Sequence, residues 1–355
     1  AYPAGPVHLN IPLTEPLYKP LPEAVLSLGK VLPDTEKPPS GTGVRPDLEL
    51  AGKKVLILAG MGKKDALLQQ ALEQLPVAVV AENISNLVAE KFISVPELVL
   101  AGASDKEREA LVPDLVISFR QQVVSKRLKL LLQSQDKLQI RELQDDPGLT
   151  DLIRQLAFMP GSDTSYQRLW KQIEDRECRK AEEYLRQASF GNLTAMAKVL
   201  DAVPANTTIH LGNSATIRYS QLFRSRSGQQ YYSNRGISGI DGSLSSAVGA
   251  AMVSEDQHLL ILGDLSFVYD SNALWNKDFP ENLKIVVLND GGGGIFRLLD
   301  GPGQMDFFEE FSVTHHPVSL ELLSAAFGRR FARATGLEEL DQHLKTCLLY
   351  TSPSP

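Results

Sequence analysis

A chain of 355 residues, 43% of them hydrophobic and 22% charged, has the composition of a globular protein and is long enough for two α/β domains. Its net charge of −7 and pI near 5.5 exclude a broad basic surface for nucleic acid, and no apolar run reaches the length of a membrane span. The two cysteines, Cys178 and Cys347, cannot form a disulfide framework, and no Cys/His spacing indicates zinc. We therefore expect an acidic protein of a reducing, cytoplasmic compartment.

The N-terminal stretch reads as the end of one domain followed by a linker. Residues 7–11 alternate apolar and polar side chains as a strand does, and we assign residues 1–18 to an earlier domain. Residues 19–48 are rich in proline, which removes backbone donors that helices and sheets need. Because the chain lacks an initiator methionine, we expect that it begins inside a longer protein.

Residues 49–160 are predicted to form a central α/β domain. Helical periodicity at residues 64–74 follows a short apolar run, and the alternation of buried strands with helices predicts a parallel sheet covered on both faces. The predicted strands are residues 53–59, 77–80, 115–118 and 138–140. Gly60-Met61-Gly62 follows the first strand as in dinucleotide-binding proteins, but the third glycine of that motif is absent.

The rest of the chain predicts a bridging helix and a second α/β domain. The bridge is assigned to residues 161–188, with a highly charged helix at 165–187, and the second domain to residues 189–346. Its predicted strands are residues 207–211, 230–232, 259–262 and 284–288, and a helix of small residues is predicted at 239–253. The fold class is thus two consecutive doubly wound parallel sheets. Residues 347–355 resemble the translation of a sequencing adapter, and we exclude them from the fold.

Two acidic turns carry the clearest chemical signal. Asp264 and Asp290 each follow an apolar strand, so both should lie at the carboxyl edge of the sheet, where open α/β sheets bind ligands. Their carboxylates, with a backbone carbonyl near Gly292, are oxygen ligands suited to Mg²⁺. The glycine run at residues 291–294 has no side chains, so its backbone N–H groups could approach a diphosphate.

These turns resemble the thiamine-diphosphate motif, which begins Gly-Asp-Gly and ends in paired asparagines. Here Leu265 stands in place of the third motif residue, and residues 263–274 are similar to one branch, the 2-succinyl-5-enolpyruvyl-6-hydroxy-3-cyclohexene-1-carboxylate synthases of menaquinone biosynthesis. Further segments that resemble this family are residues 5–10, 15–18, 125–128, 212–214 and 233–242. The resemblance implies that residues 1–18 end a pyrimidine-binding domain and that residues 189–346 bind the diphosphate and Mg²⁺.

The resemblance also implies an activity. Family members use thiamine diphosphate and Mg²⁺ to decarboxylate 2-oxoglutarate and add the succinyl carbanion to isochorismate. Both substrates are dianions, and guanidinium groups bind carboxylates in a two-pronged geometry. The positions that match substrate-binding residues of the family are Lys126, Arg127, Asn213, Ser214, Arg218 and Arg235. Those that match cofactor-binding residues are Ser238, Gly239, Asp264, Leu265, Ser266, Asp290, Gly292, Ile295 and Phe296.

Several of these residues have a second interpretation from the sequence alone. Ser214 could act as a helix N-cap as well as beside the ligand, and Ile295 and Phe296 could be core residues. Adjacent histidines, His315 and His316, suggest a metal site, but successive residues point apart and no partner ligand is visible, so we assign them to a loop.

The chain departs from the family pattern in two ways. Asp290 stands where relatives usually have asparagine, which places an additional negative charge near a diphosphate. The glutamate that activates the cofactor belongs to the pyrimidine-binding domain, and no residue of this chain can be given its role. Because the family's active site lies between subunits, we expect a homodimer or homotetramer, and we expect this chain alone to lack synthase activity.

Two other functions remain open at this point. One is a different thiamine-diphosphate carboligase or decarboxylase, such as an acetolactate-synthase relative, against which Leu265 and residues 233–242 argue. The other is a dinucleotide-binding scaffold built on the turn at Gly60.

Overall fold

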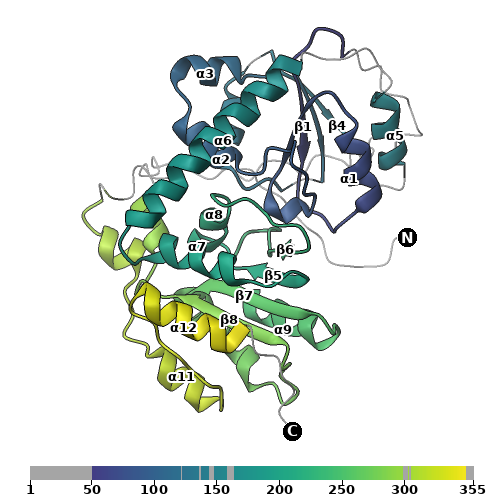
Figure 1. The fold of residues 1–355 in the computed structure, drawn as a ribbon. Coiled ribbons are helices and arrows are strands. Elements are labelled where there is room, and N and C mark those ends of the chain that lie inside the picture. Colours follow the sequence, from purple (N-terminus) through teal and green to yellow (C-terminus); the bar gives the residue numbers. More distant parts are fainter. Residues whose placement is uncertain are drawn as a thin grey trace, which may run out of the picture.

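The computed structural model describes residues 50–120, 122–135, 137–143, 148–157, 164–298, 303 and 305–348. The predictions for residues 1–18 and 19–48 lie outside this part of the chain, and so does most of the segment 347–355. Within the described part, two four-stranded sheets lie one above the other in Figure 1, and every strand pairing in them is parallel. The predicted fold class of two doubly wound parallel sheets is confirmed.

The first sheet has the strand order β2-β1-β3-β4. Its strands are β1 (Val55–Ala59), β2 (Ala78–Ala81), β3 (Leu115–Phe119) and β4 (Gln139–Glu142). The accompanying helices are α1 (Ala66–Glu73), α2 (Pro96–Gly102), α3 (Asp105–Ala110), α4 (Lys126–Gln133) and α5 (Leu149–Leu156). The predicted burial of the last strand is wrong, because all four residues of β4 are exposed at the sheet's edge.

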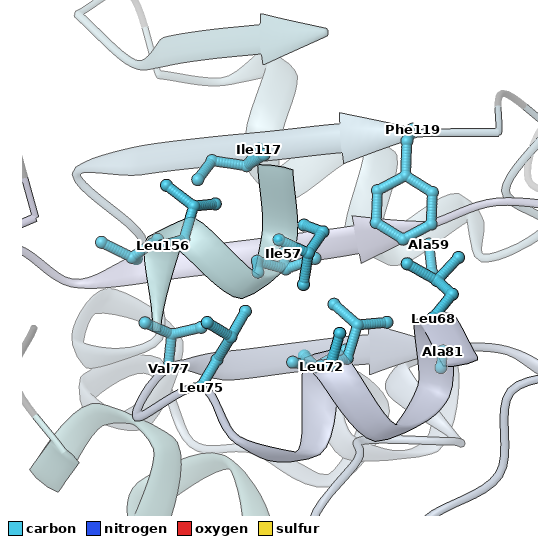
Figure 2. Packing of buried hydrophobic residues seen from close by; sticks show 14 of the residues in the cluster. Ile57, Ala59, Leu68, Leu72, Leu75, Val77, Ala81, Ile117, Phe119 and Leu156 are labelled. Atoms are coloured by element: carbon cyan, nitrogen blue, oxygen red, sulfur yellow. The ribbon is translucent and has the colours of Figure 1, made fainter. Parts of the chain in front are cut away.

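Alternation along the inner strands builds a core on each face of this sheet. Ile57 and Ile117 face α1 and α5, where they pack with Leu68, Leu72 and Leu156 (Figure 2). The intervening residues Leu56, Val80 and Val116 face the opposite way, toward Leu100 of α2, Leu128 of α4 and Trp170. Burial on both faces explains why these strands read as continuous apolar runs in the sequence.

The second sheet has the order β6-β5-β7-β8. Its strands are β5 (Thr207–Leu211), β6 (Gln230–Tyr232), β7 (Gln257–Gly263) and β8 (Leu283–Leu288). Its helices are α7 (Asn192–Ala202), α8 (Ala215–Ser220), α9 (Ser243–Met252), α10 (Asp264–Tyr269), α11 (Leu320–Ala326) and α12 (Leu337–Leu348). In Figure 1, α7 and α12 lie in front of this sheet and α9 lies behind it.

The helix predicted at residues 239–253 begins later than expected. Gly242 precedes α9 with φ of +72°, a left-handed conformation that starts the helix only at Ser243. Residues 239–242 therefore form a turn, and the carbonyl of Gly239 accepts a hydrogen bond from Asn213.

Helix α6 (Thr164–Gln187) contacts both halves of the described structure. Trp170 is fully buried against the first sheet. One turn later, the buried carboxylate of Glu174 accepts hydrogen bonds from the backbone N–H groups of Ser94 (2.7 Å) and Val95 (3.1 Å). It also forms ion pairs with Lys171 and with Arg224 of the second half.

A second connection between the halves is made by residues 82–86, which follow β2. Asn83 donates to the hydroxyl of Ser220 at 3.0 Å and accepts from the side chain of Gln221 at 2.5 Å. Asn86 pairs with both backbone groups of Tyr231 in the outermost strand β6, accepting from its N–H at 2.7 Å and donating to its carbonyl at 2.9 Å. The two sheets are thus joined by buried polar contacts as well as by α6.

None of the helices in the described residues combines the length and apolar character that a membrane crossing requires.

Candidate functional site

The candidate site lies where β7 and β8 end. Gly263 pairs with Leu288, so the residues that follow these two strands emerge side by side at one edge of the sheet. A cavity of about 140 Å³ opens there. Its lining includes Asn192, Asn213, Ser214, Ile240, Asp264, Leu265, Ser266, Asp290, Gly292, Gly293, Gly294, Ile295 and Phe296. Residues predicted from separate motifs are therefore brought together around one cavity.

Asp264 is the most buried carboxylate of this cavity, with 1% of its surface exposed. One carboxylate oxygen, Oδ1, accepts from the N–H of Leu265 at 2.7 Å. The other, Oδ2, accepts from the N–H groups of Gly291 at 2.8 Å and Gly292 at 3.0 Å. These bonds fix the turn after β8 against the turn after β7, and they hold a negative charge at the base of the cavity.

Asp290 lies at the more open side of the same cavity. Its Oδ2 accepts from the side chain of Asn192 at 3.2 Å. Partial burial, followed by the neighbouring charge of Asp264, raises the pKa of Asp290. Two carboxylates that repel each other in this way gain from a shared cation, so their arrangement is suited to a divalent metal ion.

The glycine run is required by close packing. A Cβ on Gly292, whose φ is +158°, would lie 2.6 Å from the carbonyl oxygen of Val313. A Cβ on Gly294 would lie 2.1 Å from Oδ2 of Asp290. The sequence predicts that the backbone N–H groups of these glycines are open to a diphosphate, but three of them already donate hydrogen bonds within the chain. Those of Gly291 and Gly292 are bonded to Asp264 and that of Gly293 to Val313, so an incoming ligand would have to compete for these donors.

Two histidines that the sequence assigned to a loop lie against this site. They do occupy a loop before α11, but Nε2 of His316 lies 3.2 Å from Oδ2 of Asp264. Nδ1 of His315 lies 3.2 Å from the carbonyl oxygen of Gly291. The assignment to a loop is confirmed, and among the described residues these histidines belong to no group of three or more side chains that could hold a metal. The contact joins residues 52 positions apart, and no local pattern in the sequence indicates it.

The end of β5 supplies a second wall. Asn213 is buried, and its amide donates to the carbonyl oxygens of Asn234 and Gly239, both at 2.7 Å. Its Oδ1 accepts from Arg235 at 2.9 Å, which fixes that guanidinium beside the cavity wall. Ser214 precedes α8 with φ of +70°, and its side chain makes no capping hydrogen bond. Of the two interpretations of Ser214, the side-chain N-cap is excluded.

Only some of the remaining predicted residues line the cavity. Leu265, Ser266, Ile295 and Phe296 line the cavity, and Ile295 is also largely buried. Ser238 and Gly239 lie in the turn before α9 and do not line it, although Gly239 positions Asn213. Lys126 is exposed at the first turn of α4, while Arg127 pairs with Glu97 at 3.2 Å. Arg218 is exposed on α8.

A second cavity, of about 620 Å³, lies between the two halves. Met61, Gly62 and Lys63 of the turn after β1 form one wall, and His210 and His258 of the second sheet form another. The two imidazoles stack with centroids 5.2 Å apart, and Nε2 of His210 lies 2.9 Å from Nδ1 of His258. A Cβ on Gly62 would lie 2.5 Å from the side chain of Arg120, so an arginine packs against the glycine turn that resembles a dinucleotide-binding turn.

The histidine pair predicts a pH-dependent stability. Burial lowers the pKa of His210 from its ordinary value of 6.5 to about 4, so below pH 6.5 the unfolded chain takes up a proton that the folded chain refuses. We expect the free energy of unfolding to fall by about 1 kcal/mol between pH 7 and 5.5 on account of His210. Urea unfolding at both pH values, compared between the wild type and His210→Gln, measures this contribution.

The comparison with the variant is necessary because Glu82 changes the pH dependence of stability in the opposite direction from His210. Burial raises the pKa of Glu82 to about 7, so its contribution weakens stability as the pH rises from 4.5 to 7. The free energy of unfolding of the wild type minus that of His210→Gln should therefore be higher at pH 7 than at pH 5.5. This holds even if the wild-type stability itself does not change between the two pH values. An equal difference at the two pH values would show that His210 is not held neutral.

The two carboxylates of the cavity could bind a metal ion only together with ligands of other kinds. Among the described residues, no group of three or more His, Cys, Asp or Glu side chains could hold a metal. Asp264 and Asp290 offer two carboxylates, and the remaining ligands would be backbone carbonyls, water and phosphate oxygens, as is usual for Mg²⁺. The cavity thus suits a cation that arrives with a diphosphate.

Comparison with known proteins agrees with this chemistry. Residues 212–355 match the family described as thiamine pyrophosphate enzyme, C-terminal TPP binding domain. A 2-succinyl-5-enolpyruvyl-6-hydroxy-3-cyclohexene-1-carboxylate synthase of Desulfotalea psychrophila is 36% identical over 94% of this chain and 65% of its own length. Synthases of the same name from Flavobacterium johnsoniae and Flavobacterium psychrophilum are 31% and 32% identical, over 98% and 96% of this chain and 67% and 66% of their own lengths.

The chain spans about two thirds of the length of these curated relatives. The agreement covers both sheets, and the domain match begins at Gly212, at the end of β5. The chain therefore belongs to the 2-succinyl-5-enolpyruvyl-6-hydroxy-3-cyclohexene-1-carboxylate synthase family of thiamine pyrophosphate enzymes.

Proposed function

We propose that this chain contributes the diphosphate- and metal-binding half of the active site of an enzyme that decarboxylates 2-oxoglutarate and transfers the succinyl unit to isochorismate in menaquinone biosynthesis. The observation that carries the proposal is the convergence of Asp264, Asp290 and the glycine turn on one cavity at the ends of β7 and β8. The names of the relatives supply the product, and the two substrates are those that the family resemblance implies. Thiamine diphosphate, when bound, would supply the carbanion chemistry.

In this proposal Mg²⁺ is held by the carboxylates of Asp264 and Asp290 and by a backbone carbonyl near Gly292. Of these ligands, Asp264 is the best supported, because its side chain is buried and its hydrogen bonds already fix its orientation. A cation would compete with the N–H groups of Gly291 and Gly292 for Oδ2 of Asp264. Released from Asp264, these two N–H groups could then donate to diphosphate oxygens.

The apolar part of the cavity suits the ring portion of the cofactor. Leu265 and Ile295 line it, and Phe296 stands at its rim with 36% of its surface exposed. Ser266 adds a hydroxyl to the same lining, and Ser238 and Gly239 would act from the turn before α9. The residues proposed to bind substrate are Asn213, Ser214, Arg218, Arg235, Lys126 and Arg127.

We further propose a cytoplasmic homo-oligomer with the active site between subunits, as the family resemblance implies. Large apolar side chains exposed on the second half support a contact surface there, among them Ile237 (96% exposed), Val253 (87%) and Trp275 (78%).

Calorimetry with the purified chain tests the cofactor assignment. Thiamine diphosphate with Mg²⁺ should bind, whereas NAD and FAD should not, because Arg120 fills the turn at Gly62. Binding of NAD or FAD in preference to thiamine diphosphate would favour the dinucleotide-binding scaffold and overturn the proposal.

The substrate assignment is tested in a protein of the relatives' full length that contains this chain. We expect carbon dioxide release from 2-oxoglutarate and little from pyruvate, since two guanidinium groups suit a substrate with two carboxylates. A preference for pyruvate would instead indicate an acetolactate-synthase relative. For the chain alone we expect no release from 2-oxoglutarate, because it offers no residue for the activating glutamate's role.

The variant Asp290→Asn tests the second carboxylate. The amide retains an oxygen ligand and removes a negative charge beside the diphosphate, so thiamine diphosphate should bind as tightly as in the wild type or more tightly. Calorimetric titration at saturating Mg²⁺ measures the dissociation constant. A large loss of affinity would count against the assignment of Asp290 as a replaceable oxygen ligand.

A further inference from the structure

A segment from the C-terminal part of the chain lies directly against the turns after β7 and β8. It consists of a short π-helix, Phe308–Val313, and the three residues that follow, and we call residues 308–316 the strap. π-Helices are rare and often occur at functional sites. Thr314, which ends the helix, has φ of +55°, a left-handed conformation that is strained for a β-branched residue. The strap is therefore held in an unfavourable backbone conformation beside the candidate site.

Two contacts of the strap engage groups that the cofactor is proposed to use. Nε2 of His316 lies 3.2 Å from Oδ2 of Asp264. The carbonyl oxygen of Val313 accepts a hydrogen bond from the N–H of Gly293 at 2.5 Å. A carboxylate oxygen is a ligand for Mg²⁺, and the N–H of a glycine turn is a donor for a diphosphate. The strap and the cofactor therefore compete for the same groups.

His316 is oriented as a hydrogen-bond donor to Asp264. Its Nδ1 accepts a hydrogen bond from the N–H of Val318 at 3.3 Å, so Nε2 carries the hydrogen atom that is donated to the carboxylate. A ring nitrogen that carries a hydrogen atom has no lone pair for a metal ion. In this arrangement His316 is thus not a third metal ligand but a competitor of the cation for Oδ2.

Oδ2 of Asp264 is already saturated with donors. A carboxylate oxygen offers about two acceptor sites, and three N–H groups donate to this one, from Gly291, Gly292 and His316. The two glycine groups belong to the backbone of the turn after β8. His316 instead reaches in from a position 52 residues along the chain from Asp264, and 13% of its side chain is exposed. Of the three donors, His316 is the one that can leave without distorting the turn.

The outer part of the strap is attached by half-exposed groups. Glu309 pairs with Arg297 at 2.7 Å and lies 3.0 Å from Nε2 of His315. Nδ1 of His315 lies 3.2 Å from the carbonyl oxygen of Gly291. Ion pairs that are this exposed contribute little to stability. The strap can therefore be released at small cost once His316 gives up its contact with the buried carboxylate.

We propose that the strap is a gate of the metal and diphosphate site. His316 gives up Oδ2 of Asp264 to Mg²⁺, and the strap moves away from the glycine turn, which frees the N–H of Gly293 for a diphosphate oxygen. The inference rests on the proposed function and adds to it a competition between a side chain of this chain and the cofactor. Thiamine diphosphate without Mg²⁺ brings no cation to Asp264, so it leaves His316 in place.

Calorimetric titration of thiamine diphosphate into the chain at saturating Mg²⁺ tests the competition. His316→Ala removes the competing donor, so the dissociation constant should fall about tenfold. His316→Gln keeps an N–H donor that can reach Asp264 and should bind like the wild type. The matched control is His343→Ala, which removes a histidine of α12 outside the cavity and should leave the dissociation constant unchanged.

Hydrogen exchange followed by mass spectrometry tests the movement. In the wild type, thiamine diphosphate with Mg²⁺ should speed the exchange of the backbone N–H groups of residues 308–316. Thiamine diphosphate alone should not change this exchange, because the contact of His316 with Asp264 remains.

Each failure has its own signature. An unchanged or weaker affinity of His316→Ala overturns the inference, because the histidine would then orient Asp264 or contact the cofactor. Slower or unchanged exchange of the strap with thiamine diphosphate and Mg²⁺ also overturns it, because the strap would then stay closed. In both cases the cofactor assignment stands if the wild type binds thiamine diphosphate. If neither the wild type nor His316→Ala binds it, the proposed function itself fails.

Discussion

Asp264→Asn should weaken the binding of thiamine diphosphate at saturating Mg²⁺ by about 100-fold, equivalent to about 2.7 kcal/mol. Asp264 is the buried carboxylate at the base of the cavity, where a charge acts with little solvent screening. The amide can still accept a hydrogen bond from Gly291 or Gly292, so the two turns should remain joined. What is lost is the negative charge that a cation shared with a diphosphate requires. Calorimetry measures the dissociation constant.

A matched control is available in Asp278→Asn. Asp278 is exposed in the loop before β8, so its replacement makes the same change of charge outside the cavity. We expect this variant to bind thiamine diphosphate like the wild type. If Asp264→Asn also keeps wild-type affinity, the cation is held elsewhere and the site must be reassigned.

The largest expected loss of stability comes from Glu174→Ala. The side chain of Glu174 is completely buried in α6, and its removal leaves the N–H groups of Ser94 and Val95 without an acceptor. It also leaves Lys171 and Arg224 without their shared carboxylate. Breaking a buried ion pair by removing one partner costs about 3–5 kcal/mol, and we expect a decrease in the free energy of unfolding in that range. Urea unfolding followed by circular dichroism gives the value.

Glu183→Ala provides the comparison on the same helix. Glu183 is exposed, and a surface substitution of this kind changes stability by about 0.5 kcal/mol at most. The comparison separates the loss of buried contacts from the effect of alanine on helix formation. A loss of less than about 1 kcal/mol for Glu174→Ala would mean that α6 is anchored by its apolar face alone.

The sheets could be predicted from the sequence because their signal is local. Strands such as β5 and β7 are short apolar runs bounded by turn residues, and burial on both faces makes such runs continuous. The exposure of β4 could not be predicted, because it depends on its position at the edge of the sheet. The late start of α9 depends on the left-handed backbone of Gly242, a choice that glycine permits without requiring it.

The site was predictable to the extent that strand order determines it. The parallel pairing of β7 with β8 brings Asp264 next to the turn that contains Asp290, and any doubly wound sheet with adjacent strands would do so. The contact of His316 with Asp264 depends on how a distant loop folds back. Contacts of that kind arise from tertiary packing and have no periodic signature in the sequence.

The pairing of Asn86 with Tyr231 affects the tendency of the second half to aggregate when it is produced alone. In a parallel sheet the outermost strand presents unpaired backbone groups that a strand from another molecule can join, which is a route to aggregation. The amide of Asn86 satisfies one donor and one acceptor of β6 in place of such a strand. If the second half were produced without residues 50–120, this protection would be lost, and the exposed edge would favour association between copies.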